Sequence, residues 1–158
     1  MTKKLILEVG DIAPDFDAPT DSGPDIRLTD LRGHNVVLYF YPKDDTPGCT
    51  QEACEFRDSN ADFSHLDCSI IGVSRDGVQR HHNFRAKHDL PFQLVSDIDG
   101  AICEEYGVWV KKRNYGREYM GIERSTFLID AVGVIREIWR KASVDGHVNS
   151  VLEAVRSL

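Results

Sequence analysis

The chain has 158 residues, of which 41% are hydrophobic and 28% are charged, and its formal net charge at pH 7 is −7. A single domain of this length buries roughly 70% of its unfolded surface, so folding does not require disulfide bonds. The negative charge argues against nucleic acid or an anionic membrane as the main partner.

The chain shows no sequence pattern typical of targeting or membrane insertion. At the amino terminus, only the apolar residues 5–7 lie between two lysines and Glu8, whereas a signal peptide has an apolar region of about 7–15 residues. No apolar stretch approaches the about 20 residues of a transmembrane helix. We therefore expect a cytoplasmic location, where the four cysteines would be thiols or catalytic groups rather than structural disulfides.

Apolar runs and turn residues predict alternating strands and helices, followed by a hairpin and a closing helix. Residues 8–34, rich in glycine, proline and aspartate, are predicted to form loops and a brief hairpin. The elements predicted after this region are strand 35–41, helix 48–63, strand 68–74, helix 78–88, strand 92–96, helix 101–106, strands 125–130 and 134–139 joined at 131–133, and helix 144–158. This order predicts an α/β fold with a central mixed sheet and helices on both faces.

The segment from Pro42 to Cys49 places a thiol where a predicted buried strand gives way to a helix. The free backbone N–H groups of a helix start stabilise a thiolate. Thr46 can place a hydroxyl beside the sulfur, Pro47 suits a first-turn position, and Gly48 lets the backbone approach a small group closely. A small buried hydrophobe is the alternative for Cys49, but this context favours a reactive thiol.

Besides Cys49, two further residues, Arg124 and Cys54, are candidates for the site. Arginine stays charged and offers several fixed donors, and Arg124 directly precedes a predicted core strand; a solvated strand-end charge is the alternative. Cys54 lies five residues after Cys49, which on a continuous helix gives about 7.5 Å of rise and about 140° of rotation. A disulfide between the two would require the first helical turns to unwind. An inert helix cysteine is the alternative for Cys54.

The remaining cysteines and the histidines give weaker signals. Cys68 begins a predicted buried strand and Cys103 lies in a short helix, so we expect both to be packing residues. A zinc site is disfavoured because the chain has no C-x-x-C pair and no matching ligands for its adjacent histidines. We expect a solvated, polar helix face to be formed by His81, His82 and His88. We also expect a solvated loop that contains Asp44 and Asp45.

The motif P-x-x-x-T-x-x-C, formed by Pro42, Thr46 and Cys49, together with Arg124 before the strand 125–130, resembles the peroxiredoxins. Within that family the chain is most similar to the bacterioferritin comigratory protein, or PrxQ, subfamily. The likeness extends from about residue 10 to the end and includes later stretches at 106–109, 119–122 and 139–140. It implies a thioredoxin-like fold, a single domain over residues 1–158, and chemistry without a metal or other cofactor.

The resemblance also implies a thiol peroxidase that reduces hydrogen peroxide and organic hydroperoxides. Cys49 would be the peroxidatic cysteine, Thr46 and Arg124 would orient and polarise the peroxide with Gly48 beside it, and Pro42 would shield the site from water. Cys54 matches the resolving cysteine of part of the subfamily. Thioredoxin or a similar dithiol protein would be the reductant.

The chain departs from some subfamily members in one respect. Those members carry the resolving cysteine on the next helix, but the corresponding residues of this chain, 82–85, include no cysteine. No cysteine follows Cys103, so an intersubunit disulfide is not expected; a monomer is favoured, with a dimer as the alternative. Two other functions stay open. One is a redox-sensing or holdase-type protein switched by Cys49 oxidation, and the other is a general disulfide oxidoreductase, which the missing C-x-x-C disfavours.

Overall fold

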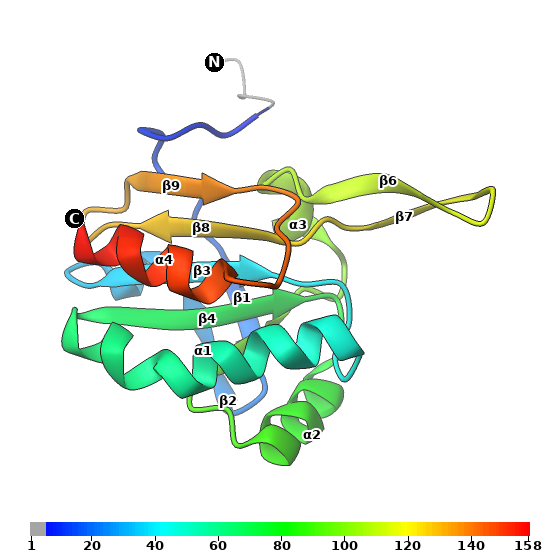
Figure 1. The fold of residues 1–158 in the computed structure, drawn as a ribbon, viewed down its shortest axis with the longest axis horizontal. Helices are drawn as coiled ribbons and strands as arrows, with labels where there is room; N and C mark the ends of the chain where they lie inside the picture. The colour runs from blue at the N-terminus through cyan, green and yellow to red at the C-terminus, as the bar shows by residue number, and fades with distance from the viewer. Residues whose placement is uncertain (1–5) are drawn as a thin grey trace.

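The computed structural model describes residues 6–158. Its elements are β1 (Asp17–Thr20), β2 (Gly23–Arg27), the 3-10 helix η1 (Leu28–Leu31), β3 (Asn35–Phe40), α1 (Pro47–His65), β4 (Cys68–Ser74), α2 (Val78–His88), β5 (Gln93–Ser96), α3 (Ala101–Glu105), β6 (Trp109–Asn114), β7 (Arg117–Ile122), β8 (Ser125–Ile129), β9 (Ile135–Trp139) and α4 (His147–Arg156) (Figure 1). No helix within the described residues has the length and apolarity to cross a membrane.

A seven-stranded mixed sheet, in the order β2-β1-β5-β4-β3-β8-β9, forms the centre of the fold. β3, β4 and β5 run parallel, whereas β8 is antiparallel to β3 and β9. The predicted mixed sheet is therefore confirmed. Because parallel strands end at the same edge, the loops after β3 and β4 lie together, and the loop after β3 leads into α1.

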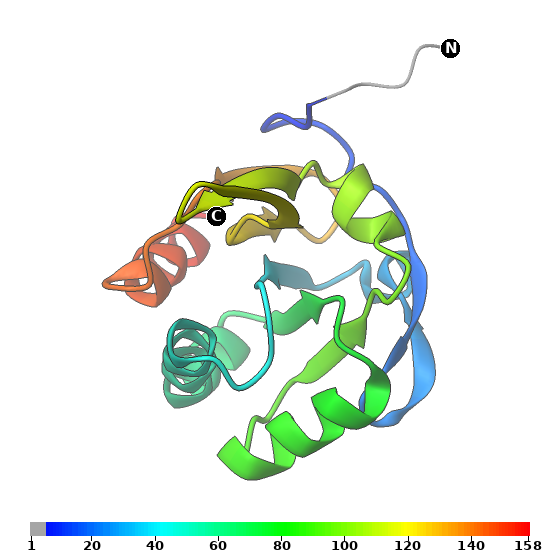
Figure 2. The same ribbon diagram turned by 90° about the vertical axis from the view of Figure 1, so that its right-hand side faces the viewer.

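Side chains of β3 alternate between two apolar clusters, one on each face of the sheet. Val37 and Tyr39 join the cluster that contains residues of α1, α2 and α4. Leu38 and Phe40 join the opposite cluster, which contains residues of α3. Figure 2 shows α1 and α4 on one side of the sheet and α3 on the other. Burial on both faces explains why the sequence of this strand is continuously apolar.

The hairpin of β6 and β7 was not predicted from the sequence. It forms a separate two-stranded sheet that extends away from the seven-stranded one (Figure 1). Most of its residues are exposed, and charged side chains interrupt both strands, so the strands lack the apolar alternation on which the prediction relied. The turn residues Tyr115 and Gly116 both have positive φ, 51° and 76°, as a tight two-residue hairpin turn requires.

Candidate active site

α1 begins directly before Cys49. Thr46 is the N-cap residue with extended backbone, and Pro47 follows at the first helical position, where no N–H needs a partner. The Thr46 carbonyl accepts a hydrogen bond from the N–H of Thr50, at 2.8 Å. Cys49 therefore lies in the first turn, whose N–H groups have no partner within the helix, and its side chain is buried.

The Thr46 hydroxyl donates its hydrogen to the carbonyl oxygen of Lys43, at 2.8 Å. This bond uses the only proton of the hydroxyl and leaves its oxygen as an acceptor. Thr46 therefore offers an acceptor close to the start of α1, where the helix supplies donors.

Arg124 lies between β7 and β8 and reaches the start of α1. Its Nη2 donates to Cys49 Sγ at 3.5 Å, and its Nη1 donates to Glu52 Oε1 at 2.6 Å. Only 16% of its side chain is exposed. The alternative of a solvated strand-end charge is therefore wrong, and a fixed cation lies against the sulfur.

Glu52 was not predicted as a site residue, although its position three residues after Cys49 places it on the same helix face. Its side chain is fully buried, and burial raises its pKa to about 7, with Arg124 opposing this shift. Glu52 Oε2 lies 3.9 Å from Nε2 of His147, which is also 2.8 Å from the Thr126 hydroxyl. Burial and the nearby Arg124 lower the pKa of His147 to about 4. The site thus combines a buried acid, a histidine and an arginine behind the thiol.

Gly48 leaves room for the arginine. A Cβ atom at this position would lie 3.2 Å from Arg124 Nη2, closer than most side-chain contacts allow. The missing side chain therefore permits the guanidinium to approach the first turn of α1.

A cavity of about 590 Å³ opens beside the arginine, and its lining includes Pro42, Lys112, Tyr119 and Arg124. Lys112 is half-buried in this wall, and desolvation together with the charge of Arg124 lowers its pKa. Pro42 and Arg124, both predicted from the sequence as site residues, therefore border the same cavity. A small polar molecule can approach the arginine through it.

A sequence model of the AhpC/TSA family matches residues 9–138. The chain belongs to the AhpC/TSA family. Peroxiredoxin Bcp of Bacillus subtilis is 49% identical over 154 residues, which cover 98% of both chains. Peroxiredoxin Bcp of Escherichia coli K12 is 41% identical over 146 residues, covering 92% of this chain and 94% of the relative.

Solved structures give the same family. The bacterioferritin comigratory protein of Xanthomonas campestris matches with a TM-score of 0.88 at 41% identity, covering 98% of each chain. A second Xanthomonas campestris structure, of peroxiredoxin Q, matches with a TM-score of 0.86 at 43% identity over 90% of each chain. The thioredoxin-like fold and the peroxiredoxin subfamily expected from the motif are therefore confirmed. The chain is accordingly an oxidoreductase of the peroxidase class.

The four cysteines of this peroxiredoxin are free thiols in very different surroundings. Cys54 lies half-buried on the continuous helix α1, five residues beyond Cys49. Burial raises the pKa of Cys68 to about 12, and burial and a hydrogen bond with Asp97 raise that of Cys103. Cys68 and Cys103 are therefore poor nucleophiles, because the reactive species is the thiolate.

Two predictions about solvated residues are wrong. His81 is completely buried rather than on a polar helix face, whereas His82 is exposed and His88 partly so. Asp44 is also completely buried, and only its neighbour Asp45 faces solvent. The physical reason is that the two buried side chains hydrogen-bond each other, so neither needs water.

Proposed function

We propose that the protein is a cysteine-based peroxidase in which the Cys49 thiolate attacks hydrogen peroxide and organic hydroperoxides. The contact of 3.5 Å between Arg124 Nη2 and Cys49 Sγ carries this proposal. A guanidinium beside the sulfur places a fixed positive charge and N–H donors where negative charge develops on the peroxide. The alkyl peroxide reduction activity described for the Xanthomonas campestris relative supports the choice of substrate.

In the first step the thiolate attacks one peroxide oxygen, so that an S–O bond forms as the O–O bond breaks. The Thr46 oxygen accepts a hydrogen bond from the O–H of the attacked peroxide oxygen, because its own hydrogen is donated to the Lys43 carbonyl oxygen. Arg124 and the N–H groups of the first turn stabilise the negative charge on the leaving oxygen. The leaving oxygen takes a proton from solvent and departs as water or an alcohol, and Cys49, which keeps the attacked oxygen and its hydrogen, becomes a sulfenic acid.

Cys54 resolves the sulfenic acid in the second step. The Cys54 thiol gives up its proton and its sulfur attacks the Cys49 sulfur; the S–O bond breaks, and the departing hydroxide takes up a proton and leaves as water as the disulfide forms. On the intact helix the two residues are separated by about 7.5 Å of rise and about 140° of rotation, so the first turns of α1 must open. Thioredoxin or a similar dithiol protein then reduces the disulfide by thiol exchange.

Disulfide mapping after one equivalent of hydrogen peroxide tests the nucleophile and its partner together. We expect one disulfide, between Cys49 and Cys54, and no peroxide consumption by Cys49→Ser. Cys68→Ser is the matched control, because it removes a thiol that burial makes unreactive. Near-normal turnover by Cys49→Ser would contradict the proposed nucleophile. A disulfide from Cys49 to Cys103 would contradict only the resolving partner.

Turnover also separates this proposal from a redox sensor. A peroxidase consumes many equivalents of peroxide per protein when a thioredoxin system supplies electrons. A sensor needs to react only once per event, so consumption that stops at one equivalent despite active thioredoxin would favour the sensor.

A further inference from the structure

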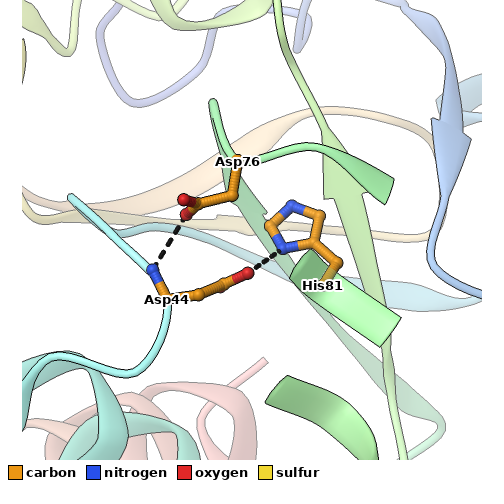
Figure 3. A group of neighbouring side chains, drawn as sticks. All are labelled: Asp44, Asp76 and His81. Atoms are coloured by element: carbon orange, nitrogen blue, oxygen red, sulfur yellow. Dashed lines mark hydrogen bonds and ion pairs between the residues drawn. The ribbon is translucent and has the colours of Figure 1, made fainter. Parts of the chain in front are cut away.

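A buried hydrogen-bond network joins the loop before Cys49 to α2 (Figure 3). Asp44 Oδ2 lies 2.6 Å from His81 Nδ1, and both side chains are completely buried. The Tyr41 hydroxyl donates to the other carboxylate oxygen, Asp44 Oδ1, at 2.5 Å. His81 Nε2 lies 3.0 Å from the carbonyl oxygen of Val95, on β5. The loop is thus tied through one histidine to both a helix and the central sheet.

The protons of this network follow from its geometry. A carbonyl oxygen only accepts, so His81 Nε2 carries a hydrogen and donates it to Val95. The short contact between His81 Nδ1 and Asp44 Oδ2 then holds one more proton, which the imidazole and the carboxyl group share. Every polar atom of these two side chains therefore has a partner, as burial demands.

Asp44, Asp76 and His81 offer ligand atoms within 4.8 Å of one another, a spacing that can also suit a metal ion. Each of these ligand atoms already has a hydrogen-bond or ion-pair partner. Asp76 Oδ2 accepts from the Ser74 hydroxyl at 2.6 Å and from the Asp44 N–H at 2.8 Å. Asp76 Oδ1 pairs with the guanidinium of Arg80 at 3.1 Å. A metal would have to displace these donors and lie near a cation, so the cluster fits a structural network better than a metal site.

Further contacts from α2 hold the same loop. Arg80 Nη2 donates to the carbonyl oxygen of Asp44 at 3.2 Å. The Lys87 ammonium lies 2.9 Å from Asp45 Oδ2, and His88 Nε2 lies 3.5 Å from Asp45 Oδ1. The two surface contacts are weak individually, whereas the buried pair cannot lose one partner cheaply. The buried Asp44 side chain is therefore the main anchor.

We propose that Asp44 and His81 are positioning residues for the peroxide site, an inference that rests on the proposed function. They hold the loop 42–46, which carries the cavity wall at Pro42 and the acceptor oxygen at Thr46. Neither residue contacts Cys49 or Arg124. Loss of the pair lets the loop shift relative to the thiol, and a shift of about 1 Å is enough to slow a reaction that depends on orientation.

Substitutions at Asp44 separate hydrogen bonding from charge. Asp44→Ala removes both side-chain bonds, and we expect the second-order rate constant of Cys49 oxidation to fall by at least about tenfold. Asp44→Asn can keep both bonds, because its oxygen accepts from Tyr41 and its amide donates to a neutral His81. We therefore expect Asp44→Asn to react within about threefold of wild type.

The rate is measured per folded molecule in a single turnover with hydrogen peroxide, so a loss of stability alone does not change it. Ile129→Ala is the matched control, because this buried residue pairs with Val36 at the far end of β3. We expect it to lower the free energy of unfolding without changing the rate. A folded Asp44→Ala with the wild-type rate would overturn the inference, as would equal losses in Asp44→Ala and Asp44→Asn.

Two further measurements keep the outcome unambiguous. Wild type that does not react with peroxide at Cys49 would refute the proposed function itself, whereas a reactive wild type with unaffected variants would refute only the positioning role. If Asp44→Ala does not fold, amide exchange in wild type decides. The Asp44 N–H, which is bound to Asp76, should exchange slowly in both the reduced and the disulfide form. Rapid exchange of this N–H in the reduced form would contradict the claim that the network around Asp44 holds the loop in place.

Discussion

The guanidinium of Arg124 forms a buried ion pair with Glu52, at 2.6 Å between Nη1 and Oε1. Its second terminal nitrogen is thereby directed to Cys49 Sγ, at 3.5 Å. One arginine thus contacts a fixed acid and the thiol at once, because its donors lie in a rigid plane. Glu52 orients the cation, and the cation acts on the sulfur.

Arg124→Lys should slow the reaction of Cys49 with peroxide although it keeps the positive charge. A lysine has one ammonium group, which cannot occupy the positions of both terminal guanidinium nitrogens, Nη1 and Nη2. We expect the second-order rate constant to fall by about 100-fold, the usual cost of a lost donor at a charge-developing site. Stopped-flow measurement with hydrogen peroxide checks this, with Arg136→Lys, at a surface ion pair, as control. A wild-type rate in Arg124→Lys would show that the reaction does not need the two donor positions of the guanidinium.

Glu52→Gln should change how stability depends on pH. The pKa of Glu52 is about 7 in the folded protein and 4.5 in the reference state, so between these values the folded state binds more protons. Stability of the wild type therefore falls through this window as pH rises. The variant lacks this loss, and its stability relative to wild type should increase by at most about 3 kcal/mol from pH 4.5 to pH 7. Urea unfolding across this range measures the difference in free energy of unfolding between the variant and wild type. A difference that does not change with pH would be evidence against the raised pKa of the buried Glu52.

His147→Gln should give the opposite slope. The pKa of His147 is about 4 in the folded protein and 6.5 in the reference state, so the unfolded state binds more protons between these values. This residue makes wild-type stability rise with pH through the window and has no such effect above it. The stability of His147→Gln relative to wild type should therefore decrease from pH 4 to pH 6.5. Urea unfolding at constant ionic strength checks the sign, and an increase would contradict the buried neutral histidine.

Gly48→Ala should slow peroxide reduction without unfolding the protein. The new Cβ would lie 3.2 Å from Arg124 Nη2 and would push the guanidinium away from its position beside Cys49. Alanine is otherwise the better helix former, so we expect a rate loss of several-fold with unchanged or higher stability. Gly77→Ala is the matched control, because this N-cap residue of α2 also lies at the start of a helix and its Cβ would meet only Ile98, at 3.9 Å. Equal effects in the two variants would remove the steric explanation.

Local patterns were enough to predict much of this fold. β4 and α2 have the predicted bounds because apolar runs, proline and aspartate mark their ends within a few residues. α4 begins at His147 rather than at residue 144, since Gly146 has a positive φ of 73° and interrupts the helical backbone. Such ends depend on backbone conformation, which an apolar stripe does not encode.

Pairings between distant residues could not be predicted from the sequence. Asp44 and His81 are 37 positions apart and look like solvated residues until the sheet brings the loop and α2 together. For Glu52 the sequence does show the spacing of three residues from Cys49, which places both on one helix face. Only the structure shows that Arg124 reaches this face and pairs with Glu52. Buried polar groups are encoded by their partners rather than by their own neighbours in the chain.

The first turns of α1 must open before Cys49 and Cys54 can form a disulfide, since an intact helix holds them too far apart. We expect amides of residues 48–56 to exchange faster in the disulfide form than in the reduced form, while those of α4 stay unchanged. Cys54→Ser should reach the sulfenic acid at the wild-type rate, lose thioredoxin-supported cycling, and keep slow exchange after oxidation. Equal exchange over residues 48–56 in reduced and disulfide-bonded wild type would contradict the opening, because the bond would then have formed on an unchanged helix.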